Sequence, residues 1–68
     1  MKVVLNGEPR EIPDGLTVQG LIHHLDLKDE RIAVERNQEI VRRADWVTAL
    51  LQEGDKLEIV HFVGGGAY

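Results

Sequence analysis

The chain has 68 residues, a formal net charge of −4 and no cysteine. This length allows a single domain with little room for a deep, water-free catalytic cavity. The lack of cysteine excludes disulfides, thiolate zinc sites and a cysteine nucleophile. The acidic balance argues against nucleic acid and anionic membranes as partners, and it suits a partner with a basic docking face. No apolar run reaches the ~20 residues of a membrane span and no signal peptide is visible, which predicts a cytoplasmic protein.

The first residues predict a β-hairpin. Residues 2–5 are rich in β-branched side chains, and Asn6-Gly7 directly after them favours a type I′ turn. A second strand is expected over 8–12. It should lie at a sheet edge, because Pro9 has no N–H to donate to a neighbouring strand.

A helix is expected next. Thr17 is placed to cap it, since a threonine hydroxyl accepts hydrogen bonds from the N–H groups of a first helical turn. The apolar residues that follow have i, i+3, i+4 and i+7 spacing and are Val18, Leu21, Ile22 and Leu25. Gly20 weakens such a helix by about 1 kcal/mol relative to alanine, so we expect it where the helix passes close to the sheet.

Three further strands are predicted in the second half of the chain, over 32–35, 39–41 and 56–63. In the last strand, Leu57 and Ile59 should face one side of the sheet, and Val60 and Phe62 the other.

The segment before the last strand predicts a short helical turn. Asp45 is expected to cap this turn, which carries Trp46 and Val47. Leu50 and Leu51 should then return the chain to the core, and Gly54-Asp55 should turn it into the last strand.

The element order β-β-α-β-β-β predicts an α+β fold, in which one main helix packs across a mixed sheet of about five strands. If the first and last strands pair in parallel at the sheet centre, this is the β-grasp, or ubiquitin-like, arrangement. We therefore expect a β-grasp domain over 1–63 and a flexible glycine-rich tail over 64–68.

The side chains offer few candidates for catalysis. The chain has no serine, and no pair of acidic residues has the spacing of a general acid and base. His23 and His24 are adjacent, so a helix would point them about 100° apart and they would not share one metal ion easily. Arg42-Arg43 is expected in a solvated loop, with contact to an anionic ligand as the alternative. We therefore expect neither an enzyme nor a metal site.

The glycine run Gly64-Gly65-Gly66 carries more weight. It lacks the following helix and the Lys-Ser/Thr pair of a phosphate-binding loop. Ordering three glycines costs conformational entropy and adds nothing to a core, so a plain flexible tail is one interpretation. The other is a segment without Cβ atoms, thin enough to thread a narrow channel in another protein.

Six short motifs are distributed along essentially the whole chain. They are Asn6-Gly7-Glu8, Thr17-Val18, Ala33-Val34-Glu35-Arg36-Asn37, Glu39-Ile40-Val41, Gly54-Asp55 and the segment from Glu58 to Gly66. Together they resemble the ThiS family, the sulfur carriers of thiamin thiazole biosynthesis. A glycine pair alone is weak evidence, but its combination with the other motifs at matching spacing is specific.

This resemblance implies a function for the tail. The carboxylate of Gly66 would be adenylated by an E1-like adenylyltransferase of the ThiF type, which uses ATP and magnesium. Sulfur from a cysteine-derived donor would then convert it to a thiocarboxylate, and a thiazole synthase of the ThiG type would take that sulfur. Gly64 and Gly65 would thread the partner's active site. The carrier would be a protein co-substrate that binds no cofactor itself.

The chain departs from the family pattern at its end. Typical members stop at the glycine pair, whereas here Ala67-Tyr68 follows and leaves the Gly66 carbonyl in an amide bond. The resemblance to carriers with such a tail implies a precursor, from which a metalloprotease removes Ala67-Tyr68. An addition foreign to the natural chain is the other interpretation.

Val60 and Phe62 are candidates for partner docking if they lie on the uncovered face of the sheet, with ordinary packing as the equal alternative. Two other functions fit the same sequence. One is a ubiquitin-like carrier for another pathway, such as cysteine, homocysteine or molybdopterin synthesis. The other is a β-grasp interaction module without covalent chemistry, whose function would survive deletion of Gly65-Gly66.

Overall fold

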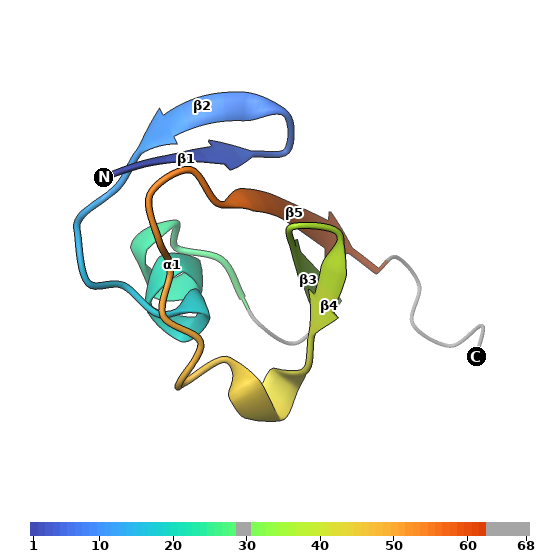
Figure 1. The fold of residues 1–68 in the computed structure, drawn as a ribbon. Coiled ribbons are helices and arrows are strands. Elements are labelled where there is room, and N and C mark those ends of the chain that lie inside the picture. Colours follow the sequence, from blue (N-terminus) through green and yellow to red (C-terminus); the bar gives the residue numbers. More distant parts are fainter. Residues whose placement is uncertain (29–30, 63–68) are drawn as a thin grey trace.

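The computed structural model describes residues 1–28 and 31–62, and these contain five strands, one α-helix and a 3₁₀-helix. Along the chain they are β1 (Lys2–Leu5), β2 (Glu8–Glu11), α1 (Val18–His24), β3 (Ile32–Arg36), β4 (Glu39–Val41), η2 (Arg43–Asp45) and β5 (Lys56–His61). The sheet order is β2-β1-β5-β3-β4, and β1 and β5 run parallel at its centre. Figure 1 shows α1 lying to one side of this sheet. The predicted β-grasp topology is therefore confirmed, with the Pro9 strand at one edge.

Both hairpins turn through residues with positive φ. Asn6 and Gly7 have φ values of 50° and 84°, as the predicted type I′ turn requires. Asn37 and Gln38 connect β3 to β4 with φ values of 53° and 73°. Such turns match the right-handed twist of the strands that they join.

The helix begins as predicted. The Thr17 hydroxyl accepts a hydrogen bond from the Gly20 N–H at 3.1 Å, and Leu25 ends the helix as its C-cap. The expectation for Gly20 was wrong, because a Cβ there would meet Leu16 Cδ2 at 3.2 Å and not the sheet. Gly20 thus leaves space for the side chain of Leu16, which precedes the helix.

The core lies between α1 and the sheet. Among residues 1–28 and 31–62 it contains twelve buried apolar residues: Val3, Leu5, Ile12, Val18, Leu21, Ile22, Ile32, Val34, Trp46, Leu51, Leu57 and Ile59. Trp46 is only 1% exposed, and its indole N–H donates to the Val41 carbonyl at 3.0 Å. Arg43 covers its ring at 4.4 Å from the centroid and donates to the Ile32 carbonyl at 3.1 Å. Arg42 and Arg43 are both exposed, as expected for a solvated segment, but the Arg43 guanidinium also packs on the Trp46 ring.

Two expectations for the loop before β5 were wrong. Asp45 does not cap a helical turn, because η2 ends at this residue and Arg42 occupies the N-cap position without a side-chain hydrogen bond. Leu50 is 53% exposed, whereas Leu51 is buried as expected. The backbone explains Leu50, since it bridges to Thr17 at the start of the helix and its side chain points away from the core.

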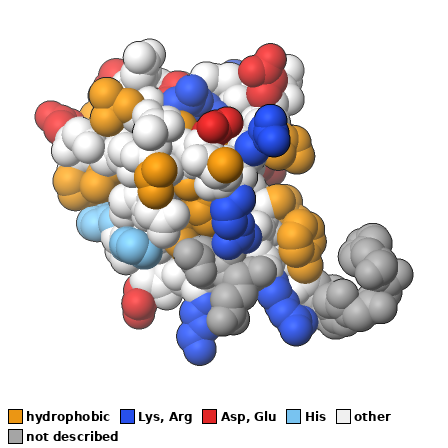
Figure 2. Space-filling view, turned by 90° about the horizontal axis from the view of Figure 1, so that it is seen from below, with side chains coloured by type: hydrophobic (Ala, Val, Ile, Leu, Met, Phe, Trp, Pro, Cys, Tyr) orange, Lys and Arg blue, Asp and Glu red, His pale blue; other side chains and the backbone are white. Residues whose placement is uncertain are grey.

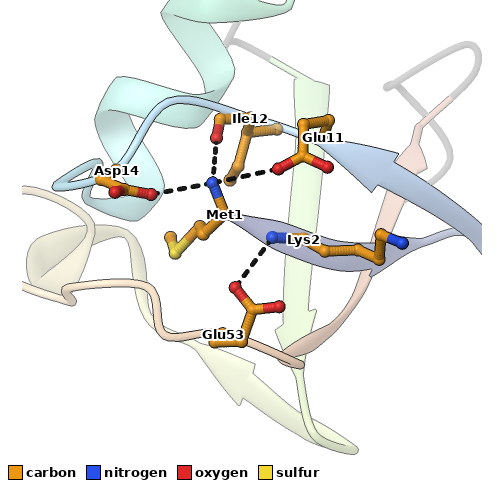
Figure 3. Close-up of polar contacts among 6 residues, drawn as sticks. All are labelled: Met1, Lys2, Glu11, Ile12, Asp14 and Glu53. Carbon is orange, nitrogen blue, oxygen red and sulfur yellow. Dashed lines mark hydrogen bonds and ion pairs between the residues drawn. The ribbon is translucent and has the colours of Figure 1, made fainter.

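The N-terminus anchors the start of the central strand β1 (Figure 3). The Met1 ammonium group donates to the Ile12 carbonyl at 2.6 Å and to Asp14 Oδ1 at 2.8 Å, and it lies 3.4 Å from Glu11 Oε2. Lys2 N–H donates to the Glu53 carboxylate at 2.9 Å. The hydrogen bond with Asp14, and then that with Glu11, raises the pKa of this ammonium group above its ordinary value of 8.0.

We predict that stability falls at alkaline pH partly through this amine. Because its pKa is raised in the folded chain, its contribution is complete below the ordinary value of 8.0 and is lost as the pH rises through the raised value. Denaturant unfolding across this range measures the loss. Asp14→Asn should flatten the pH dependence, and an unchanged profile in that variant would contradict the assignment.

Candidate functional site

The proposed sulfur-carrying residue lies beyond the described part of the chain. Gly64, Gly65, Gly66 and Ala67-Tyr68 are all outside residues 1–28 and 31–62, as is Val63. The candidate site is therefore built from β5, the strand that leads to them. β5 ends at His61, two residues before the predicted end, but the Phe62 N–H still donates to the Arg31 carbonyl at 2.7 Å.

Asn6 holds the middle of β5 from the side of β1. Its Oδ1 accepts from the Ile59 N–H at 2.8 Å, and its Nδ2 donates to the Ile59 carbonyl at 3.4 Å. The side chain thus continues the parallel pairing after the backbone of β1 has turned away at Gly7. The sequence indicated Asn6 only as a turn residue.

Asn37 makes similar hydrogen bonds to the backbone at the start of β5. Its N–H donates to the Lys56 carbonyl at 2.7 Å, and its Oδ1 accepts from the Lys56 N–H at 3.0 Å. Its Nδ2 donates to Asp55 Oδ1 at 3.1 Å, and the buried Asp55 also accepts from the Gln52 N–H at 2.9 Å. In both hairpin turns, an asparagine side chain therefore hydrogen-bonds to the backbone of β5.

The face of the sheet away from the helix carries exposed apolar side chains. Val60 and Phe62 are 50% and 47% exposed, which confirms their predicted face but leaves docking a prediction. Val60 stands opposite Ala33 on β3. Ile40 of β4, 64% exposed, lies on the same face and was missed. The signal was available, since its neighbour Val41 packs against the core and strand side chains alternate.

A shallow groove of about 240 Å³ lies on the helix side of the sheet, beside the end of β5. It is lined by Leu5, Asn6, Arg10, Leu25, Leu27, Ile59 and His61. Its floor is mainly apolar, and Arg10 and His61 are its basic members. No hydroxyl, thiol or carboxylate side chain of the described residues lines it beside His61, so the groove offers a surface for contact rather than a reaction centre.

His23 and His24, unlike His61, do not line this groove. His23 Nε2 lies 3.0 Å from Gln19 Nε2, one helical turn away, and His23 and His24 are both exposed. Over residues 1–28 and 31–62, the structure contains no group of three His, Cys, Asp or Glu side chains that could hold a metal ion. In the same segments, no helix is long and apolar enough to cross a membrane.

A mixed sheet with parallel central strands and one helix across it defines the class of ubiquitin-like β-grasp domains. The crystal structure of the thiamine biosynthesis protein ThiS from Geobacter metallireducens superposes with a TM-score of 0.86 at 30% sequence identity, covering 97% of this chain and 100% of that chain. The model of the ThiS family matches residues 3–66. This chain belongs to the ThiS family.

Curated relatives include separate sulfur carrier proteins and thiazole synthases. The sulfur carrier protein ThiS of Escherichia coli is 30% identical over 66 residues, which cover 97% of this chain and 100% of the relative. The thiazole synthase of Magnetococcus marinus is 46% identical over 68 residues, which cover 100% of this chain but 21% of the relative. The thiazole synthase of Paramagnetospirillum magneticum is 45% identical over 67 residues, again 21% of its length. The chain thus spans about a fifth of the length of these synthases.

We predict that Asn6→Gly lowers the free energy of unfolding by about 1–2 kcal/mol, because it removes two hydrogen bonds to Ile59. Glycine adopts the positive φ without strain but adds conformational freedom to the unfolded chain, so the hydrogen bonds are read from the difference between this variant and a glycine control. Gln38→Gly is the matched control, since Gln38 has a positive φ of 73° and is exposed in the other hairpin turn. Equal unfolding energies for the two variants would contradict the role of Asn6.

Proposed function

We propose that this chain is a protein sulfur carrier for thiamin thiazole formation. The observation that carries the proposal is the placement of β5 in the centre of a ThiS-family fold. β5 pairs with a strand on each side, and the side chains of Asn6 and Asn37 hydrogen-bond to its backbone. In the sequence, Gly64-Gly65-Gly66 follows shortly after this strand. A rigid strand followed by glycines presents a backbone carbonyl to a partner's active site.

The chemistry needs no catalytic side chain from the carrier. One oxygen of the Gly66 carboxylate attacks the α-phosphorus of ATP in the adenylyltransferase, and pyrophosphate leaves. A carboxylate is a poor electrophile, whereas the acyl-adenylate has AMP as a leaving group. Hydrosulfide supplied by a cysteine-derived donor then attacks the acyl carbon: a C–S bond forms, the C–O bond to AMP breaks, and loss of the proton leaves the thiocarboxylate. ATP and magnesium are used by the partner, and the carrier acts as co-substrate.

Similarity to the thiazole synthases supports a synthase of the ThiG type as the sulfur acceptor. Two such synthases contain a segment that matches almost all of this chain within one polypeptide. Joining two domains in one chain raises the effective concentration of one for the other. This arrangement favours the thiazole pathway over the cysteine, homocysteine and molybdopterin pathways as the destination of the sulfur.

The residues after Gly66 define the form that can react. With Ala67-Tyr68 attached, the Gly66 carbonyl is an amide and has no carboxylate to adenylate. We propose that a metalloprotease removes these two residues before activation.

Intact-mass spectrometry tests the carrier and the precursor together. The 68-residue chain and a chain ending at Gly66 are each incubated with the adenylyltransferase of the source organism, ATP, magnesium and a cysteine-derived sulfur donor. We expect the shorter chain alone to gain the mass of an oxygen-to-sulfur exchange, and host lysate to remove Ala67-Tyr68 from the longer one. Sulfur on the intact chain would reject the precursor, and sulfur on neither would reject the carrier.

Phe62→Ala should weaken binding to the adenylyltransferase by about tenfold, because aromatic side chains at the centre of an interface dominate binding energy. Titration calorimetry measures the change. Val47→Ala is the matched control, since Val47 is 63% exposed but lies in the loop after η2, away from the strands. If both variants bind like the unaltered chain, Phe62 does not contact this partner.

A further inference from the structure

The end of β5 is surrounded by basic residues, although the whole chain has a net charge of −4. Arg10 lines the groove beside Ile59 and His61, and Lys28 directly follows Leu27, which lines the same groove. We call Arg10, Lys28, Arg31 and Arg43 the basic cluster.

Arg31 and Arg43 approach β5 from its other side. The Arg31 carbonyl accepts from the Phe62 N–H at 2.7 Å. The Arg43 guanidinium donates to the carbonyl of Ile32, which pairs with His61. Figure 2 shows Lys and Arg side chains extending from the centre of one face to its lower edge, with hydrophobic side chains beside them.

Four of the twelve acidic residues lie at the opposite end of the molecule. Glu11, Asp14 and Glu53 surround the N-terminus, and Asp55 stands at the start of β5. The ion pairs among the described residues are all made here, by Met1 with Glu11 and Asp14 and by Arg36 with Asp55. The basic cluster makes no ion pair with any described residue. Arg10, Lys28 and Arg31 are exposed to solvent and to a partner, whereas the Arg43 guanidinium already packs on the Trp46 ring and donates to Ile32.

We propose that the basic cluster docks against an acidic rim around the channel of the enzyme that receives the glycine run. This inference rests on the proposed function, because it assigns the charge of that partner. It reverses the expectation of a basic docking face that the net charge gave. Docking depends on the charges that meet across the interface, and within the Debye length these are the local ones.

A protein partner fits better than a polyanion. Nucleic acid binding draws its strength from release of many counterions by a basic surface. A chain of net charge −4 is repelled by a polyanion at long range, whereas an acidic rim of a few carboxylates acts only at contact. Val60 and Phe62 lie on the other face of the sheet from the groove that Arg10 lines, but the Phe62 N–H donates to the carbonyl of Arg31 in the cluster. Exposed apolar residues near charged ones suit a protein surface, which combines an apolar core with a polar rim.

Charge reversal tests the proposal with the full chain. The double variant Arg10→Glu/Lys28→Glu is titrated into the adenylyltransferase at low and high salt, and Lys2→Glu/Lys56→Glu serves as control. Both variants change the net charge equally, but Lys2 lies on β1 and Lys56 at the far end of β5. We expect the cluster variant to lose about tenfold or more in affinity at low salt, the control about twofold, and the difference to shrink as salt screens the charges.

The remaining outcomes overturn the proposal. They are equal losses in both variants, tighter binding by the cluster variant, failure of the unaltered chain to bind, and binding of a duplex oligonucleotide at physiological salt. Arg10→Gln/Lys28→Gln, which removes the charges without adding carboxylates, should lose a smaller part of the affinity if the Glu variant does not fold. Sulfur loading measured by mass reports the proposed function separately, because it is read from the product and not from the affinity.

Discussion

The fold depends on the parallel pairing of β1 with β5 at the centre of the sheet. The paired register is short, since only Val4 with Lys56 and Leu5 with Leu57 stand as partners. The Asn6 side chain lengthens it by bonding both backbone groups of Ile59. This pairing places β5 between β1 and β3, buries Leu57 and Ile59 beneath the helix, and fixes the direction in which the chain leaves the domain.

Local patterns predicted most of this architecture because they act over a few residues. Asn6-Gly7, the Thr17 cap and the alternation along β5 each depend on neighbours in sequence. The failures depend on distant neighbours. Leu50 is exposed because its backbone bridges to Thr17. An apolar side chain alone does not show which of two adjacent leucines reaches the core.

The candidate site also contains features that sequence neighbours determine and features that distant residues determine. The alternation of side chains along β5 predicted that Val60 and Phe62 lie on the exposed face. The hydrogen bonds between Asn6 and Ile59 join residues 53 positions apart and can be inferred only once the strand order is known. The basic cluster is likewise assembled from three separate elements or loops, so the net charge of the chain does not reveal it. The role of Gly66 stays a prediction, because it rests on motif resemblance and lies outside the described residues.

The edges of the sheet bear on how such a protein persists in a cell. β2 is exposed at all four positions, with two glutamates, an arginine and Pro9, and β4 at the other edge has three residues. Short, charged or proline-bearing edges resist strand addition from other copies. Both edges therefore disfavour pairing between copies of the chain. In the function that we propose, this keeps the surface around β5 free for successive partner enzymes.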